Sequence, residues 1–448
     1  MHMEKKNIEN FLNEEYKEFA MYSLESRAIA SMIDGFKPVQ RKIIHISSNI
    51  WKTGNEKTLR VFQLSGKVAS DSFYHHGDKS LNDAIINMAQ SFKNNAPLLD
   101  EDGQFGSLRS PESGAPRYIG TRLNSSFRKI YKDFNLLENQ IEEGEMIEPK
   151  FLLPIIPMLL INGGGGIAVG FRSEILNRDV KTVARECLRF LKSNRVNKIP
   201  PHLNGFKGTY RQDDDNPNKW WVKGVFERVN TTTVKITELP PSITYQNYED
   251  HLEKLIENDA IKSYEDNCRD DVNYVIKMSR KDLKEITDDK LVKLLKLEET
   301  QYEYLNVLDE NGKLKTFTDV KDILKYFVKF RLKWYDIRKK TILENMEKDL
   351  KVMTNKAKFI SLIIKGDILI NNIKKTDIEK SIAKYKLDKV LGSYNYLFKI
   401  PIHNLTKENY EKIQNDMKAS KKDISYLKKV KPKDMYIDEL EDFIKKWK

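Results

Sequence analysis

The stretch Gly114-Ala-Pro-Arg-Tyr-Ile-Gly-Thr-Arg122 places Tyr118 directly after Arg117 and close to a second arginine. A phenol is a poor nucleophile while protonated, and its free pKa is about 10. Nearby guanidinium groups favour the phenolate and offset the charge that develops on phosphoryl oxygens. The stretch therefore predicts a tyrosine that attacks a phosphodiester. Taken alone, an Arg-Tyr pair is more often a partly buried anchor beside a solvated arginine.

Further motifs surround this stretch in a fixed order. Upstream are Arg27-Ala-Ile, Asp34-Gly-Phe-Lys-Pro-Val-Gln-Arg-Lys42, Tyr74-His-His-Gly-Asp78, Leu98-Leu-Asp100 and Gly103-Gln-Phe-Gly-Ser107. Downstream is Pro154-Ile-Ile-Pro-Met-Leu-Leu-Ile-Asn-Gly-Gly-Gly-Gly-Ile-Ala-Val-Gly170. Over nearly the whole chain, this set resembles the breakage–reunion subunit of type IIA DNA topoisomerases, the gyrase A and topoisomerase IV C family. The Tyr-His-His-Gly form and the short length favour its phage branch, the medium subunit.

The resemblance implies a catalytic group and a DNA-contacting group. The catalytic group is Tyr118, Arg117, His76 and Arg27. The DNA-contacting group is Lys37, Arg41, Lys42, His75, Ile167 and Arg122. Which histidine acts stays open, because adjacent histidines are often plain turn residues. Lys37 and Arg41 are four residues apart and would share a helix face, which is a solvated basic face in most proteins. For Arg122, two interpretations have equal weight: a contact with a DNA phosphate, and an ordinary surface arginine without a function.

The glycine run Gly163–Gly166 does not have the GxxxxGK[ST] order of a nucleotide-binding loop. The resemblance implies instead a tight turn that lets Ile167 wedge between base pairs and bend the duplex, as apolar wedges do. A buried core isoleucine is the alternative. The segment Phe171–Leu176 departs from the family's usual Ala-Thr-Asn-Ile-Pro-Pro, which leaves the local DNA contacts open.

Composition limits the class of protein. A chain of 448 residues exceeds one ordinary core and predicts two or three domains. The net charge of +12 favours an anionic partner, although Lys- and Asn-rich proteomes also make basic proteins. Cys187 and Cys268 are too few for a disulfide framework or a zinc cluster. The apolar stretch 151–161 is too short to span a bilayer, so we expect no membrane. The two cysteines favour reduced packing residues, and we expect a bacterial or phage-infected host cytoplasm.

The pattern and the resemblance together predict an α+β multidomain fold that is mostly helical. The expected parts are a helical arm (1–30), a winged-helix (CAP-like) DNA-cleavage domain (31–150), a mixed α/β tower domain (151–320), and a long antiparallel coiled coil with a small globular dimer gate (321–448). No proline occurs between Pro241 and Pro401, which permits a helix over 320–365 of roughly 65–70 Å. We expect the helical tail 406–448 to pack against it and a globule over 366–401.

Several local elements are also predicted. Residues 7–30 read as a helix, and residues 80–92 form a second one with Asp78 or Ser80 as its cap. The β-branched stretch 231–239 reads as a strand with 220–226 as its partner. The run Asp213–Asp215 reads as a solvent loop rather than a metal site.

The expected function is transient double-strand DNA cleavage through a 5′-phosphotyrosyl bond and passage of a second duplex. Two identical chains would meet at the winged-helix domain and at the C-terminal gate. The family's Mg²⁺-binding acidic cluster and its ATPase have no counterpart in the sequence, so ATP and Mg²⁺ are expected on partner chains that carry the ATPase and Toprim parts. The alternatives are a topoisomerase IV-type subunit lacking its C-terminal domain and a winged-helix DNA-binding protein without chemistry.

Overall fold

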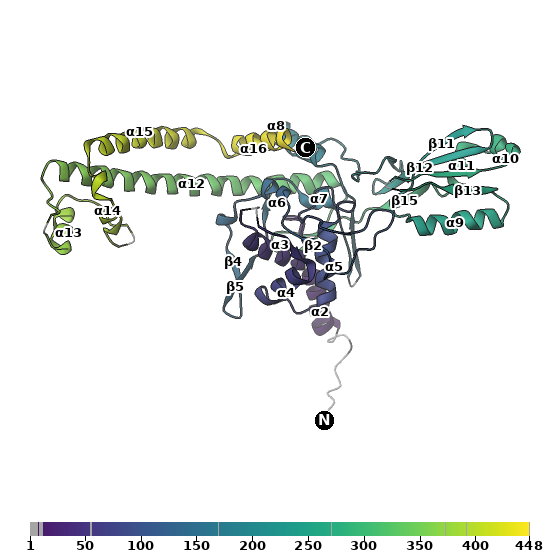
Figure 1. Cartoon of the computed structure of the whole chain (residues 1–448), viewed down its shortest axis with the longest axis horizontal. Coiled ribbons are helices and arrows are strands. Elements are labelled where there is room, and N and C mark those ends of the chain that lie inside the picture. The colour runs from purple at the N-terminus through teal and green to yellow at the C-terminus, as the bar shows by residue number, and fades with distance from the viewer. Residues whose placement is uncertain are drawn as a thin grey trace, which may run out of the picture. The chain divides into compact units, whose positions relative to one another are not determined.

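The computed structural model describes residue 8 and residues 12–53, 56–168, 170–269, 271–371, 373–390 and 392–447. It is a mixed α/β protein whose elements are labelled in Figure 1. The chain divides into two compact units. The first unit consists of two segments, the chain up to Arg331 and the chain from Leu440 onward. The second unit comprises Leu332–Glu439. No described helix is long and apolar enough to cross a membrane.

Helices dominate the first 90 residues. Their bounds are η1 (Leu12–Tyr16), α2 (Lys17–Ser23), η2 (Leu24–Ala28), α3 (Pro38–Ile50), α4 (Val61–Asp71) and α5 (Asp78–Ala89). The predicted helix over 7–30 is thus helical from Leu12 to Ala28, with π-helical turns at both ends, while 1–7 and 9–11 lie outside the described residues. Helices α3, α4 and α5 pack against one another.

The predicted cap of α5 is wrong. The helix begins at Asp78, and its N-cap is Gly77, which has a φ of +84° and provides no side-chain cap. Glycine is suited to this position because a residue with a side chain rarely adopts such a φ. The helix also ends at Ala89, three residues before the predicted end, and it buries Leu81, Ile85 and Met88 as its apolar spacing predicts.

Short hairpins and bridges surround these helices. The two-stranded pairs are β1 (Leu59–Arg60) with β2 (Gly120–Thr121), β3 (Tyr131–Lys132) with β6 (Leu153–Pro154), β4 (Asn139–Glu142) with β5 (Glu145–Pro149), β7 (Gly164–Ala168) with β8 (Phe171–Ile175), and β16 (Asn306–Leu308) with β17 (Leu314–Thr316). The helices between them are α6 (Ser125–Ile130), η3 (Phe134–Leu136), α7 (Met158–Asn162) and α8 (Val180–Ser193).

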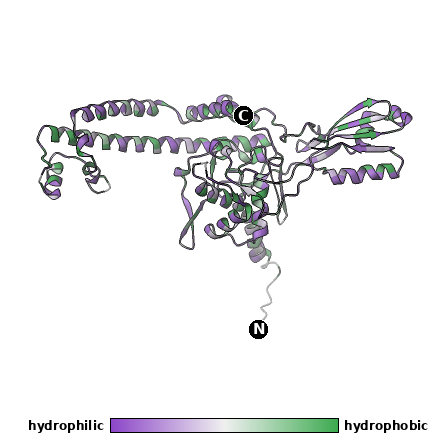
Figure 2. Ribbon diagram, in the orientation of Figure 1, coloured by the Kyte–Doolittle hydropathy of each residue, from purple (hydrophilic) through white to green (hydrophobic). Residues whose placement is uncertain are grey.

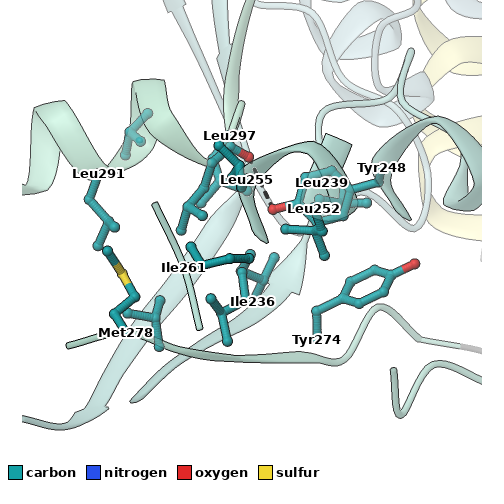
Figure 3. Close-up of a cluster of buried hydrophobic side chains, with 14 of the residues drawn as sticks. Ile236, Leu239, Tyr248, Leu252, Leu255, Ile261, Tyr274, Met278, Leu291 and Leu297 are labelled. Carbon is teal, nitrogen blue, oxygen red and sulfur yellow. Dashed lines mark hydrogen bonds between the residues drawn. The ribbon is translucent and has the colours of Figure 1, made fainter. Parts of the chain in front are cut away.

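A four-stranded antiparallel sheet carries a core of its own. Its order is β11 (Val225–Asn230), β12 (Thr233–Glu238), β14 (Tyr274–Lys277) and β13 (Ser263–Asp266). Helices α9 (Tyr245–Glu257), α10 (Arg280–Glu285) and α11 (Asp288–Leu294) belong to the same region. Figure 3 shows the apolar cluster between them, where Ile236 and Tyr274 from the sheet lie close to Leu252 of α9.

The strand over 231–239 is confirmed as β12, but its predicted partner is only partly right. Residues 220–226 break at Gly224 into two strands, and only β11 pairs with β12. The other half, β10 (Lys219–Lys223), pairs with β9 (Thr209–Gln212) and β15 (Glu298–Tyr302) in a separate sheet. A Cβ on Gly224 would lie 2.3 Å from the Glu238 carbonyl oxygen, so only glycine permits this crossing.

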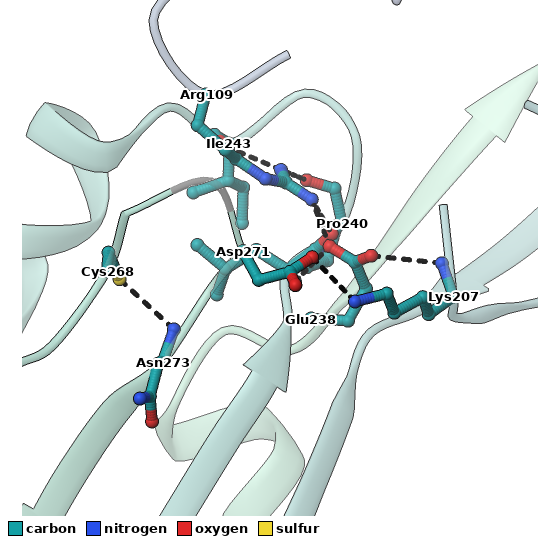
Figure 4. A network of polar contacts seen from close by, with 9 residues as sticks. Arg109, Lys207, Glu238, Pro240, Ile243, Cys268, Asp271 and Asn273 are labelled. Carbon is teal, nitrogen blue, oxygen red and sulfur yellow. Dashed lines mark hydrogen bonds and ion pairs between the residues drawn. The ribbon is translucent and has the colours of Figure 1, made fainter. Parts of the chain in front are cut away.

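Buried ion pairs join the segments of this unit. Arg109 is buried and binds Glu238 together with the carbonyls of Leu239, Pro240 and Ile243 (Figure 4). The Arg178–Glu303 pair is also buried, and the Glu303 carboxylate accepts further hydrogen bonds from Leu176 N and Trp220 Nε1. Buried charges are tolerated only when paired and hydrogen-bonded in this way.

The predicted long helix is confirmed as α12 (Val320–Ile364). Along Leu332–Glu439 it runs antiparallel to the tail helices α15 (Lys407–Lys429) and α16 (Pro432–Lys446), because Tyr335 stacks on Tyr436 whereas Glu347, further along α12, binds Lys428. Helices α13 (Lys375–Lys384), α14 (Asn395–Phe398) and η4 (Ile402–Asn404) follow α12, and an apolar cluster including Phe359, Ile382 and Leu397 packs there. Figure 2 shows both hydropathy colours along these helices.

Candidate active site

Tyr118 lies on a short loop that is fixed by main-chain hydrogen bonds. Its own N–H donates to the Ala115 carbonyl at 2.9 Å, and the loop is followed at once by β2. The start of α4 holds the other side, since Val61 N donates to Ile119 O and Phe62 N donates to Pro116 O, each at 3.1 Å. The phenol ring projects outward and is 71% exposed. The loop therefore presents an accessible tyrosine on a rigid backbone, which is the geometry that a nucleophile needs.

Arg60 contacts this loop and was not predicted from the sequence. Its guanidinium Nη1 donates to the main-chain carbonyl of Tyr118 at 2.6 Å. The β1–β2 register explains the contact, because Arg60 pairs directly with Gly120. A lone basic residue before a helix carries no functional signal in sequence, and only the strand register brings it to the tyrosine.

The predicted pair Arg27 and His76 does come together. Arg27 Nη2 lies 3.0 Å from His76 Nδ1. Because a guanidinium can only donate, Nδ1 accepts, and the neutral imidazole carries its proton on Nε2. Burial lowers the pKa of His76, and the charges of Arg27 and His75 act in the same direction. In this contact the exposed ring is neutral, and its Nε2–H is left as a donor.

The two predicted catalytic groups occupy opposite ends of one helix. The loop with Arg117 and Tyr118 is bonded to the start of α4, whereas His76 follows the end of α4. The 11 residues of α4 span about 16 Å at 1.5 Å per residue. Arg117 is exposed like Tyr118, so both can face a ligand.

Lys37 links the Asp34–Lys42 motif to the glycine run. Its Nζ donates to the Gly165 carbonyl at 2.7 Å, and burial lowers its pKa. Gly166 is required here because an added Cβ would lie 1.9 Å from the Ala28 carbonyl oxygen. Arg27, Lys37 and Gly163–Gly165 line one groove of about 610 Å³.

Ile167 is not a core residue. It lies on β7, opposite Arg172 of β8, and is 80% exposed. The base of the hairpin is anchored, since Glu174 and Tyr304 exchange two main-chain hydrogen bonds at 3.0 and 2.8 Å. A fixed hairpin thus holds a large apolar side chain in solvent, which excludes the buried alternative.

The expected basic face on α3 is not observed. Arg41 is 8% exposed, and its guanidinium donates to both carboxylate oxygens of Asp34 at 2.7 and 3.2 Å. Lys42 is half-buried and binds the Ser72 carbonyl and Glu148. Arg41 is buried because Asp34 sits in the core and needs a counter-charge, a feature that the spacing of basic residues cannot reveal.

Two further residues of the predicted set are exposed. Arg122 bonds Asp100 at 2.7 Å, so its guanidinium already has a carboxylate partner. His75 lies in the turn before α5 and is exposed beside His76.

The carboxylates near the tyrosine loop are hydrogen-bonded to neighbouring groups. Each member of the run Asp100–Asp102 is engaged: Asp100 with Arg122, Glu101 with Ser91, and Asp102 with Thr58. Within the described residues, no group of three or more His, Cys, Asp or Glu side chains could hold a metal ion. The Asp213 carboxylate is also hydrogen-bonded. It accepts from Lys219 and Trp221, and these hydrogen bonds lower the pKa of Asp213 to about 2.

The chain is similar to known DNA topoisomerases over nearly its whole length. The A-subunit family of DNA gyrase/topoisomerase IV matches residues 27–441. The DNA topoisomerase medium subunit of Enterobacteria phage T4 is 30% identical over 99% of this chain and 100% of its own length. The mitochondrial DNA topoisomerase 2 of Dictyostelium discoideum is 32% identical over 98% of this chain, which spans only 35% of that relative.

A solved structure is also similar. The DNA-binding, cleavage and re-ligation domain of Plasmodium falciparum topoisomerase II superposes with a TM-score of 0.85 at 30% identity. The match covers 97% of this chain and 64% of that one.

Proposed function

Because the chain belongs to the A-subunit family of DNA gyrase/topoisomerase IV, we propose that it is the DNA-cleaving and re-ligating subunit of a type IIA DNA topoisomerase. The observation that carries this proposal is the exposed Tyr118 on a loop fixed between α4 and β2. The comparable medium subunit of phage T4 supports the same assignment.

The proposed reaction is a reversible transesterification. The Tyr118 oxygen attacks a backbone phosphorus, loses its proton and forms a 5′-phosphotyrosyl ester, while the 3′ oxygen leaves and is protonated. Arg117 stabilises the charge on the phosphoryl oxygens. Because one ester replaces another, the reverse reaction reseals the strand without an energy source.

Arg27 and His76 are proposed to act on the phosphate as a unit. Arg27 fixes the tautomer of His76, so that the imidazole Nε2–H can donate to a phosphoryl oxygen. His75 is proposed as a nearby DNA contact. Lys37 is proposed to contact the backbone at the groove that it shares with Arg27. We assign Arg41 and Lys42 to the scaffold, since both are paired with carboxylates.

Double-stranded DNA is the proposed substrate, and Ile167 is the proposed wedge. The net charge of +12 favours a polyanion, and an exposed isoleucine on an anchored hairpin suits insertion between base pairs. Arg122 is a weaker candidate contact because Asp100 must release it.

Two copies would cut the two strands, one tyrosine each, as closed two-fold symmetry allows. In this proposal, α3–α5 form the winged-helix domain, the β-sheets form the tower, α12 and the tail helices form the coiled coil, and the cluster around Phe359 forms the C-terminal gate. ATP and Mg²⁺ are proposed to bind partner chains that carry the ATPase and Toprim parts.

A covalent-adduct assay tests the proposal. The chain is incubated with supercoiled DNA, Mg²⁺ and its partner chains, and denaturant is then added to trap protein on DNA. We expect wild type to remain attached and Tyr118→Phe to bind DNA without attachment. DNA binding without any adduct would support the simple binding protein instead. An adduct of undiminished yield from Tyr118→Phe would refute the assignment of the nucleophile.

A further inference from the structure

We propose that Arg60 is a positioning residue that connects a DNA phosphate to the backbone of the nucleophile loop. This inference rests on the function proposed above, and it adds a residue outside the predicted site. The direct observation is the 2.6 Å hydrogen bond from Arg60 Nη1 to the carbonyl oxygen of Tyr118.

The main chain on both sides of this contact is fixed. Arg60 N donates to the Gln63 side chain at 3.0 Å, which closes the first turn of α4. Opposite Arg60 in the register, Gly120 exchanges two hydrogen bonds with Asp102, at 2.7 and 3.0 Å. A Cβ on Gly120 would lie 2.7 Å from Asp102 Oδ2, so the two segments are pressed together. The Arg60 side chain therefore joins two main-chain segments, at Arg60 and at Tyr118, that are both fixed by hydrogen bonds.

The guanidinium has donors left for a ligand. Arginine carries five N–H donors in a planar fork, and one of them serves the Tyr118 carbonyl. Arg60, Arg117 and Tyr118 are all exposed, and the hydrogen bond to the Tyr118 carbonyl places the Arg60 guanidinium at that residue. A DNA phosphate bound at Tyr118 would therefore be within reach of the remaining donors. A phosphate bound there would hold the guanidinium in place and, through the carbonyl, the peptide group of Tyr118.

The positioning role can be distinguished from a simple DNA contact. A simple contact would change DNA affinity and the rate of adduct formation together, whereas a positioning residue can change the rate alone. A lysine at position 60 keeps the positive charge but has a compact ammonium group without the planar fork. It can neutralise a phosphate, but it cannot hold the phosphate and the Tyr118 carbonyl in the geometry of a guanidinium. The positioning role therefore predicts that a lysine preserves DNA affinity and loses rate.

The test uses Arg60→Lys, Arg60→Gln and the control Lys67→Gln in the complete enzyme. Lys67 is exposed on α4, the helix that Arg60 precedes, and its replacement removes the same charge. We measure DNA affinity across salt concentrations and the single-turnover rate of adduct formation. Arg60→Lys should bind within about twofold of wild type but form adduct about tenfold more slowly, because small misplacements of a reacting group are costly. Arg60→Gln should also lose about one unit of salt slope.

The control should keep its rate within about twofold of wild type. An Arg60→Lys enzyme with the wild-type rate, or Lys67→Gln as slow as Arg60→Gln, would overturn the positioning role. Thermal unfolding of each variant identifies any loss that comes from misfolding, and a slow Arg60→Lys variant that is also unstable would count against the proposal. A wild-type chain that forms no adduct would instead refute the proposed function, and with it the role of Arg60.

Discussion

The contact between Arg27 and His76 fixes which imidazole nitrogen accepts and which can donate. Protonation of His76 would place an N–H on Nδ1, facing a guanidinium that can only donate. The contact therefore survives only with the neutral ring. Because burial and neighbouring charge lower the pKa of His76, the neutral form persists below the ordinary histidine pKa.

Adduct formation should therefore depend on pH. Adduct formation should fall on acidification with a midpoint below about 6.5, the usual histidine pKa. Arg27→Gln keeps a donor but removes the charge that lowers the pKa of His76, so the midpoint should move upward. Single-turnover rates between pH 4.5 and 8, with an NMR titration of the ring, measure both quantities.

The matched control is Lys79→Gln, which removes an exposed charge at the start of α5 that is not among the causes of the lowered pKa. Its midpoint should equal that of wild type. An Arg27→Gln midpoint that is unchanged or lower would contradict the assigned interaction. The same sign applies to stability: the unfolded chain takes up the proton first, so the contribution of His76 is present above about pH 6.5 and is lost as pH falls.

The β7–β8 hairpin can lie close against η2 because Gly166 has no side chain. Gly166→Ala would place its Cβ 1.9 Å from the Ala28 carbonyl, so backbone must move, at a cost of about 1–3 kcal/mol. Gly165→Ala is the control, because its nearest neighbour, the Ser173 carbonyl, lies 3.8 Å away. Chemical denaturation should show a clear loss for the first variant and little for the second. Equal stability of the two variants would show that the hairpin is not pressed against η2.

The same hairpin predicts a separation of folding from DNA bending. Ile167→Ala removes a side chain that is 80% exposed, so unfolding should change by less than about 0.5 kcal/mol. DNA bending, measured by energy transfer between dyes at the duplex ends, should decrease markedly. Ile402→Ala, at an equally exposed isoleucine of η4, should leave bending unchanged. Undiminished bending by Ile167→Ala would exclude the wedge.

The sequence predicts an element best where one strong pattern decides it. The proline-free stretch predicted α12, and β-branched alternation predicted β12. It failed where tertiary contacts decide: Gly224 splits a predicted strand because the chain passes close to Glu238, and Gly77 rather than a polar side chain caps α5. Arg41 was predicted to contact DNA, but it is buried in an ion pair with Asp34. Arg60 was missed because only strand pairing brings it to Tyr118.

At the scale of the whole molecule, buried charge pairs hold distant segments together. Glu303 accepts from Arg178, Leu176 and Trp220 in the interior, so it joins the chain before α8 to β10. Glu303→Gln leaves a buried guanidinium without its counter-charge and should cost about 3 kcal/mol. Urea denaturation measures the loss. Glu174→Gln, which breaks the exposed pair with Arg172, should cost less than about 1 kcal/mol. Similar losses for both variants would contradict this account.

The identity of the covalently attached residue decides whether Tyr118 is the nucleophile. The complete enzyme is trapped on DNA, digested with nuclease and protease, and the nucleotide-bearing peptide is sequenced by mass spectrometry. We predict a single peptide that contains Tyr118 joined to a 5′ phosphate, with a free 3′ hydroxyl on the other DNA end. Attachment at any other residue, or to a 3′ phosphate, would rule out a 5′-phosphotyrosyl bond at Tyr118.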